Sequence, residues 1–260
     1  MPIAPVSPAE GWGVLHLYHR VDRTRLDEPG AAKRILDAVA ALEADDHQVL
    51  TFAVLGHKAD LGFMAIGPDL ARLQRFQQEL LDGPLNPEYS YVSLTEQSEY
   101  AQTENDERAR LARDEGVTDA AEVDERLAVW RERIEHYREQ RIHPKMPMRA
   151  AMCFYPMSKR RTGDDNWFSL DFDARKRLMG GHARVGRTYA GRVLQLITGS
   201  TGLDDWEWGV TLLADDIGAL KDIVYEMRFD EVSARYAEFG PFITGLISSP
   251  EAVLDSVGLR

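Results

Sequence analysis

The sequence predicts an α+β fold in which one chain forms two ferredoxin-like βαββαβ lobes, packed sheet to sheet as a dimeric α+β barrel. Two observations support this prediction. The hydrophobic pattern alternates between the periods of strands and helices in the order βαββαβ, and the same order then occurs a second time. A charged stretch separates the two occurrences. We therefore expect an N-terminal lobe over residues 1–98, a connecting helical segment over 99–145 and a C-terminal lobe over 146–260.

The N-terminal lobe shows four expected strands and two expected helices. Apolar residues at helical spacing indicate the helices, and Pro29 and Gly30 precede the first of them. A polar turn, HKAD, joins the second and third strands. The expected strands are 11–20, 47–56, 61–67 and 89–97, and the expected helices are 31–42 and 69–81.

The connecting segment is expected to contain one helix, which Thr118 can cap and which the stretch QRIHPKMP ends. Its apolar side chains fall on one helical face. We expect this segment to pack through that face as a connecting helix; the face comprises Val123, Leu127, Trp130, Ile134 and Tyr137.

The C-terminal lobe repeats the pattern. The expected strands are 149–161, 191–200 and 206–215, the expected helices are 172–189 and 216–227, and residues 228–239 are expected to finish the lobe in extended form. An internal duplication explains the repeat. When the two first strands are aligned, Tyr18 lies over Tyr155 and Asp22 lies over Lys159, while Thr51 takes the place of Gln195 in the second strands.

Composition limits the classes of function. The 260-residue chain has a net charge of −12, which argues against a general nucleic-acid binder. No apolar run reaches the ~18 residues of a membrane helix, and the N-terminus does not resemble a signal peptide. The single cysteine, Cys153, excludes an internal disulfide and suits a reducing compartment, so we expect a cytoplasmic protein.

One segment is basic in this acidic chain. Residues 159–192 contain nine basic and four acidic side chains. This basic segment suits a small polyanionic ligand, but a solvated helix face balanced by partners elsewhere would look the same.

His182 follows two glycines in MGGHARVGRTY, where Gly180, Gly181 and Gly186 each disfavour a helix by about 1 kcal/mol relative to alanine. Such glycines are tolerated where something flat must approach the backbone, which makes His182 a candidate axial ligand to a haem-type iron. A single histidine on a helix is more often a surface or core residue. No second ligand stands at zinc spacing from it.

Four further residues are unusual for a hydrophobic core. Tyr155, Met157 and Lys159 lie on one face of the strand in CFYPMSKRR, and they suit the wall of a cofactor site. Alternatively, Tyr155 is a core tyrosine and Lys159 extends to water at the strand end. Gln195 lies within the apolar strand GRVLQLITGS, where it either bonds neighbouring backbone or points into a pocket.

These motifs together resemble those of the coproheme decarboxylases, in the chlorite dismutase superfamily. The similar stretches are FYPMSKRR, GGHARVGRTYAGRVLQLITGSTGLDDWEWGVTL and YEMRFDEVSARYAEFGPF, all in the second half; the first half matches in its order of elements. The resemblance implies an enzyme of haem biosynthesis. With hydrogen peroxide, such an enzyme oxidatively decarboxylates two propionates of iron coproporphyrin III (coproheme) to vinyl groups, which gives haem b. It also implies a homopentamer with the porphyrin in the C-terminal lobe, and it leaves open a transient contact with a coproporphyrin ferrochelatase.

The resemblance also assigns roles to individual residues. His182 matches the iron ligand, Tyr155 the tyrosine that takes hydrogen from a propionate, and Lys159 the lysine that binds a reacting propionate. The remaining matches hold propionates (Arg141, Arg228 and Ser233), lie near the macrocycle edge (Met157) or lie over the distal face of the iron (Gln195).

Other functions remain open on the sequence. A chlorite dismutase or haem peroxidase is one alternative, although the resemblance implies arginine at position 195 in enzymes that turn over chlorite. A haem-binding carrier or sensor is another, and it would need His182 but not Tyr155 or Lys159. We expect one porphyrin per chain, because residues 31–42 contain no histidine to match His182.

Overall fold

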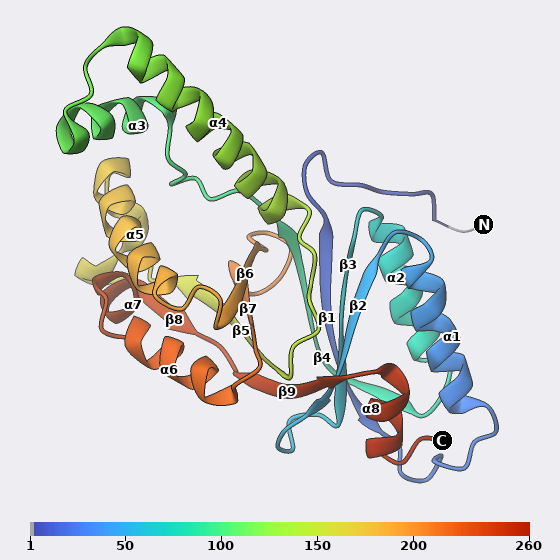
Figure 1. Cartoon of the computed structure of the whole chain (residues 1–260). Helices are drawn as coiled ribbons and strands as arrows, with labels where there is room; N and C mark the ends of the chain where they lie inside the picture. The colour runs from blue at the N-terminus through green and yellow to red at the C-terminus, as the bar shows by residue number, and fades with distance from the viewer. Residues whose placement is uncertain (1–2) are drawn as a thin grey trace.

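The computed structural model describes residues 3–260 and has an α+β fold, as predicted (Figure 1). The strands are β1 (Gly13–Val21), β2 (Gln48–Val54), β3 (Leu61–Gly67), β4 (Leu85–Thr95), β5 (Ala151–Lys159), β6 (Val193–Gly199), β7 (Trp208–Ala214), β8 (Ala237–Phe239) and β9 (Ile243–Ser248). The α-helices are α1 (Ala31–Glu43), α2 (Leu70–Leu80), α3 (Glu104–Arg110), α4 (Ala120–Ile142), α5 (Phe172–Arg187), α6 (Ile217–Met227), α7 (Glu231–Tyr236) and α8 (Pro250–Ser256).

The two lobes have the same strand order. The N-terminal sheet runs β4-β1-β3-β2, and the C-terminal sheet runs β9-β5-β7-β6, so both place the fourth strand beside the first. All pairings between these strands are antiparallel. Short pairings of β4 with β6 and of β2 with β9 join the sheets at both edges. The result is a closed barrel of eight strands, with β8 added beside β5.

Three hydrophobic cores hold this arrangement together. The inner core lies between the two sheets and contains Tyr18, Phe52 and Phe154. A second core lies between the outer face of the N-terminal sheet and helices α1, α2 and α8. The third lies on the outer face of the C-terminal sheet, where Tyr155 packs with residues of α6. Strand alternation therefore sends Phe154 into the barrel and Tyr155 out of it.

The structure corrects the predicted register between the lobes. Tyr18 lies in the inner core, whereas Tyr155 lies on the outer face, so the two tyrosines are not equivalent. The outward-facing residues of β1 include Leu17 and Val21. Since strand side chains alternate, Asp22 does not share the outward face that Lys159 takes in its strand, whereas its neighbour Val21 does.

Several elements were predicted wrongly or missed. Residues 228–239 are not wholly extended: α7 precedes the three-residue strand β8. Helices α3 and α8 and strand β9 were not predicted, and β4 begins four residues before the predicted start at 89. On α4, Val123 and Leu127 are buried against Leu111, but Tyr137 is 58% exposed, so the expected packing is wrong for Tyr137.

Candidate functional site

Helix α5 buries fewer residues than its counterpart α1. Five residues of α1 are buried, whereas Gly186 is the single buried residue of α5. The inward face of α5 carries His182 and is only partly buried. Gly186 is four residues from His182 and shares this face. A Cβ atom there would lie 3.0 Å from Met227 Cε, so the glycine permits close packing.

Gly180 and Gly181 do not lie on the face of His182. A Cβ atom added at either would meet nothing within 4 Å, and both residues are exposed. Gly186 is therefore the one of the three glycines whose backbone packs closely against other residues, whereas the space beside Gly180 and Gly181 is open.

His182 is oriented by a carboxylate. Its Nδ1 lies 3.0 Å from Asp230 Oδ2, and Asp230 also accepts hydrogen bonds from the backbone N and the Oγ of Ser233, both at 3.1 Å. Burial alone would raise the pKa of Asp230, but the hydrogen bonds and the His182 charge hold it below its ordinary value. An Nδ1–H donor to this carboxylate leaves the Nε2 lone pair available to a metal.

Tyr155 lies in an aromatic cluster. Its ring is 6% exposed, stacks on Phe242 at 4.4 Å and lies 5.8 Å from Phe239. The Tyr155 hydroxyl makes no hydrogen bond to any residue that the structure describes, and burial raises its pKa. The guanidinium of Arg228 lies 4.7 Å from the Phe239 ring centre. This cluster places a neutral phenol near a cation.

Lys159 is a buried cation at the end of the same strand. It is 7% exposed, and its Nζ lies 4.6 Å from the centre of the Trp167 ring. Within residues 3–260, no carboxylate lies within 4 Å of this nitrogen. Burial lowers the pKa of Lys159 to about 8, although Asp230 and Glu207 oppose the shift. An anionic ligand group would restore the charge balance that burial removes.

A cleft of about 710 Å³ opens beside these residues. It brings together Arg228 and Ser233, two of the predicted propionate-binding residues. The hydroxyl of Ser233, however, is bonded to Asp230. The residues that line the cleft are Arg160, Arg228, Ser233, Ala234, Ala237, Glu238, Phe239, Gly240 and Phe242.

The structure places the other predicted residues around the same face. Gln195 donates from Nε2 to the carbonyl oxygen of Gly186 at 3.1 Å, so its amide bonds backbone, as the first of the two alternatives proposed. Met157 pairs with Phe239 of β8 and packs in the same core as Tyr155. Arg141 lies in the last turn of α4, and in the described chain no hydrogen bond or ion pair joins it to the cluster.

The basic segment divides into paired and unpaired side chains. Four of its nine basic residues have carboxylate partners within 4 Å, in the pairs Arg160–Asp165, Arg161–Glu207, Arg175–Glu99 and Lys176–Asp106. The other five form no ion pair with a described residue. Internal partners therefore balance part of the charge of this segment.

Sequence reasoning missed Asp230, Trp167 and Phe242. Asp230 caps α7 by accepting from Ser233 N, and the spacing of an acidic residue before a serine was the available signal. No sequence signal indicated that Asp230 lies beside His182, which is 48 residues away in the chain. No group of three or more potential metal ligands occurs in residues 3–260.

Comparison with known proteins identifies the family. The sequence model of the chlorite dismutase family matches residues 30–248. The chain belongs to the chlorite dismutase family. A heme-binding protein of Thermus thermophilus has 35% sequence identity and a TM-score of 0.79, with 100% of this chain and 99% of that chain covered. A mutant chlorite dismutase of Candidatus Nitrospira defluvii has a TM-score of 0.71 and 17% identity, over 96% of this chain and 97% of that one.

A further family relative comes from Natronomonas pharaonis and is named as a heme-binding protein. It is 39% identical over 256 residues, which cover 93% of this chain and 40% of the relative. The chain thus spans about two fifths of that relative's length. In residues 3–260 of our chain, no helix is long and apolar enough to cross a membrane.

Proposed function

We propose that the protein is a hydrogen peroxide-dependent coproheme decarboxylase, an oxidoreductase that converts two propionates of iron coproporphyrin III into vinyl groups and so forms haem b. One observation carries the proposal: β5 presents on one face a buried phenol, Tyr155, and a buried, unpaired ammonium, Lys159. A protein that only bound haem would need neither group there.

The residues fit an iron porphyrin on physical grounds. His182 can offer Nε2 from the partly buried face of α5 while Asp230 fixes the opposite ring nitrogen. Neither Lys159 nor Arg228 has a carboxylate within 4 Å in the described chain, so both can offer a cation to a ligand, and Arg141 would add a third. A substrate with four propionates suits such a site better than an apolar one.

The balance of the reaction defines what the chain must do. Each propionate loses carbon dioxide, one proton and two electrons, while hydrogen peroxide accepts two electrons and two protons and becomes two waters. When bound, the iron porphyrin supplies the redox centre at which peroxide is reduced. The chain binds and orients the substrate and relays hydrogen.

Tyr155 is suited to the hydrogen relay. Because burial raises the pKa of Tyr155, the phenol stays protonated near neutral pH, and its electron and proton must leave together. Lys159 would hold the reacting carboxylate against it. A carboxylate that approaches Lys159 would raise the pKa of the lysine again and keep it charged.

Gln195 argues for peroxide chemistry over chlorite chemistry. A neutral amide over the iron would stabilise an anionic intermediate less than an arginine would. We also propose that Met157 borders the macrocycle, that the C-terminal lobe within residues 146–260 binds the porphyrin, and that the enzyme works in the cytoplasm as a homopentamer. Within that range, α8 packs on the N-terminal sheet and is not part of the porphyrin-binding lobe. Transient contact with a coproporphyrin ferrochelatase would supply the substrate.

The test is mass spectrometry of iron coproporphyrin III after peroxide addition to the protein. We expect two successive losses of carbon dioxide and two hydrogens, and none with Tyr155→Phe, which should bind the porphyrin as well as the parent. The matched control is Tyr18→Phe, since Tyr18 is equally buried in the same barrel, also lacks a hydroxyl partner and faces the barrel interior. Parental product formation by Tyr155→Phe would contradict the mechanism.

A second candidate function, haem binding without chemistry, is favoured by one observation. The Gln195 amide donates one N–H to Gly186 O, so part of its hydrogen-bonding capacity serves the protein backbone and not a ligand on iron. Tight binding of the porphyrin with no mass change after peroxide would support this function instead.

A further inference from the structure

The helix that carries His182 is anchored at its first turns by the connecting segment, which belongs to neither lobe. Tyr100 stacks on Phe172 of α5 at 5.9 Å between ring centres, and its hydroxyl accepts a hydrogen bond from Arg175 Nε at 3.2 Å. Lys176 Nζ lies 2.6 Å from Asp106 Oδ2, at the beginning of α3. These contacts add to the partial packing of Leu178 and Met179 against Val232 and Tyr236, since Gly186 is the one fully buried residue of α5.

The anchoring residues are themselves fixed. Asp106 closes a capping box with Thr103, and its bonds to Lys176 and Thr103 lower the pKa of Asp106 to about 2. The carboxylate therefore stays charged throughout the physiological range. Tyr100 stays neutral as well, because burial chiefly raises its pKa to about 12.

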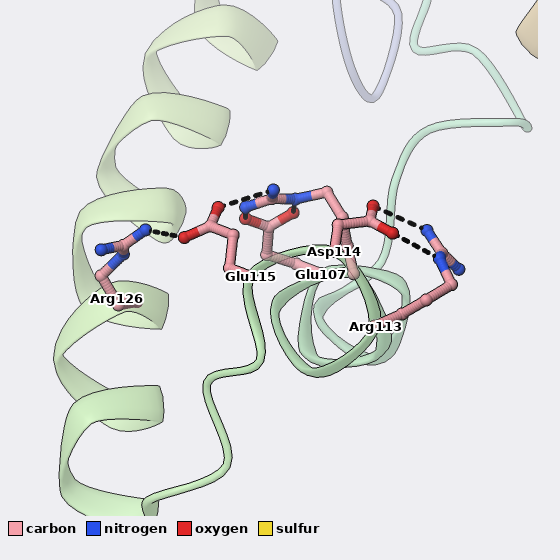
Figure 2. A network of polar contacts seen from close by, with 6 residues as sticks. Glu107, Arg113, Asp114, Glu115 and Arg126 are labelled. Atoms are coloured by element: carbon pink, nitrogen blue, oxygen red, sulfur yellow. Dashed lines mark hydrogen bonds and ion pairs between the residues drawn. The ribbon is translucent and has the colours of Figure 1, made fainter.

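A network of ion pairs links the parts of the connecting segment that follow Tyr100 and Asp106 (Figure 2). Arg110 bonds both oxygens of the buried Glu107, at 2.7 and 2.8 Å, and reaches Glu115 at 2.8 Å. Arg126 of α4 pairs with the other oxygen of Glu115. Helix α3, the π-helical turn at Leu111–Glu115 and α4 are thereby linked, so they resist displacement as a unit.

Tyr100 also reaches the second part of the site. Its ring lies 6.3 Å from Trp167, edge to face, and Trp167 is the ring beneath Lys159 Nζ. One residue of the connecting segment thus contacts both the helix of His182 and the aromatic support of Lys159.

We propose that Tyr100 and the Asp106–Lys176 pair are positioning residues of the porphyrin site, which hold α5 at the separation from the sheet that porphyrin binding requires. The inference rests on the proposed function for its effect on porphyrin, but not for its effect on α5. Loss of these contacts frees the first turns of α5, while the packing of Leu178 and Met179 and the His182–Asp230 bond retain the rest.

The test uses Lys176→Gln, which removes the charge, and Lys176→Arg, which keeps it. The control is Lys33→Gln, because Lys33 pairs with Asp37 at the same 2.6 Å distance on the remote helix α1. Hydrogen exchange of α5 amides is measured without porphyrin. We expect exchange about fivefold faster in Lys176→Gln, the factor that corresponds to ~1 kcal/mol, with parental rates in Lys176→Arg and Lys33→Gln.

The second measurement is the dissociation rate of iron coproporphyrin III, with the histidine-ligated absorption spectrum recorded alongside. We expect dissociation about fivefold faster in Lys176→Gln with the ligated spectrum retained. Tyr100→Leu should affect both measurements, while Tyr100→Phe, which keeps the ring, should affect them less. Equal α5 exchange in Lys176→Gln and Lys33→Gln would overturn the inference. Absence of porphyrin binding by the parent would instead overturn the proposed function, since the exchange measurement needs no porphyrin.

Discussion

The buried charge of Lys159 should lower the free energy of unfolding, so replacing this lysine with an apolar residue should raise it. The side chain is 7% exposed and has no carboxylate within 4 Å among the described residues. Burial lowers the pKa of Lys159 from 10.5 to about 8. At about 1.4 kcal/mol per pH unit, this difference corresponds to about 3 kcal/mol of unfolding free energy at pH 7.

The pH dependence follows from the direction of the shift. Below about pH 8 the lysine is charged in both states, so the folded protein carries the full penalty. Between about 8 and 10.5 the folded state releases the proton first, and the stability of the parent rises. Lys159→Met should therefore be more stable than the parent at pH 7, and roughly half of this advantage should be lost by about pH 9.5.

Urea unfolding of both proteins at the two pH values measures the effect. Lys33→Met is the control, because Lys33 is exposed on α1, and it should change stability by less than about 0.5 kcal/mol at either pH. The Lys159→Met protein should also lose decarboxylation. A stability difference that is the same at both pH values would refute the assignment of Lys159 as a buried, unpaired cation.

Three further outcomes follow from the site. Titration with iron coproporphyrin III should saturate at one equivalent per chain, and His182→Ala should abolish the histidine-ligated absorption spectrum; saturation at two equivalents would show a second site in the N-terminal lobe. The unmodified protein should release no oxygen from chlorite, because Gln195 is neutral, and an oxygen electrode tests this directly. Gly180→Ala should raise the unfolding free energy by about 0.5–1 kcal/mol without changing porphyrin affinity, since the added methyl faces open space; weaker porphyrin binding by this variant would place Gly180 at the site after all.

The N-terminal lobe illustrates why one site per chain is expected. Aligning the two first strands by sequence puts the negative charge of Asp22 at the position of Lys159, where it would oppose an anion, but in the structure the outward-facing residue at this end of β1 is Val21. The packing of α1 against its sheet provides a better reason to expect no second site. Helix α1 buries five residues against its sheet, and residues 31–43 contain no histidine.

The elements with clear periodicity were predictable from sequence because local spacing encodes them. Strands β1, β3 and β7 and helices α1, α2 and α6 lie within one to three residues of their predicted ends. The short elements were not predicted, because they span too few residues to show a periodic pattern. Helix α3 has seven residues and a face of mixed charge, so its capping box at Thr103 was its one signal.

The sequence by itself determined the fold class, the family resemblance and the residue types that the chemistry needs: a histidine on a helix, a phenol and an ammonium on one strand face, and an amide in an apolar strand. Tertiary structure decided how these groups are used. It joined His182 to Asp230, left Lys159 without a partner and bonded Gln195 to Gly186. Such pairings depend on where distant segments meet, and spacing along the chain carries no information about contacts across 9–48 residues. Strand alternation also decided, by a single residue of register, that Tyr155 faces the helices and Tyr18 the barrel.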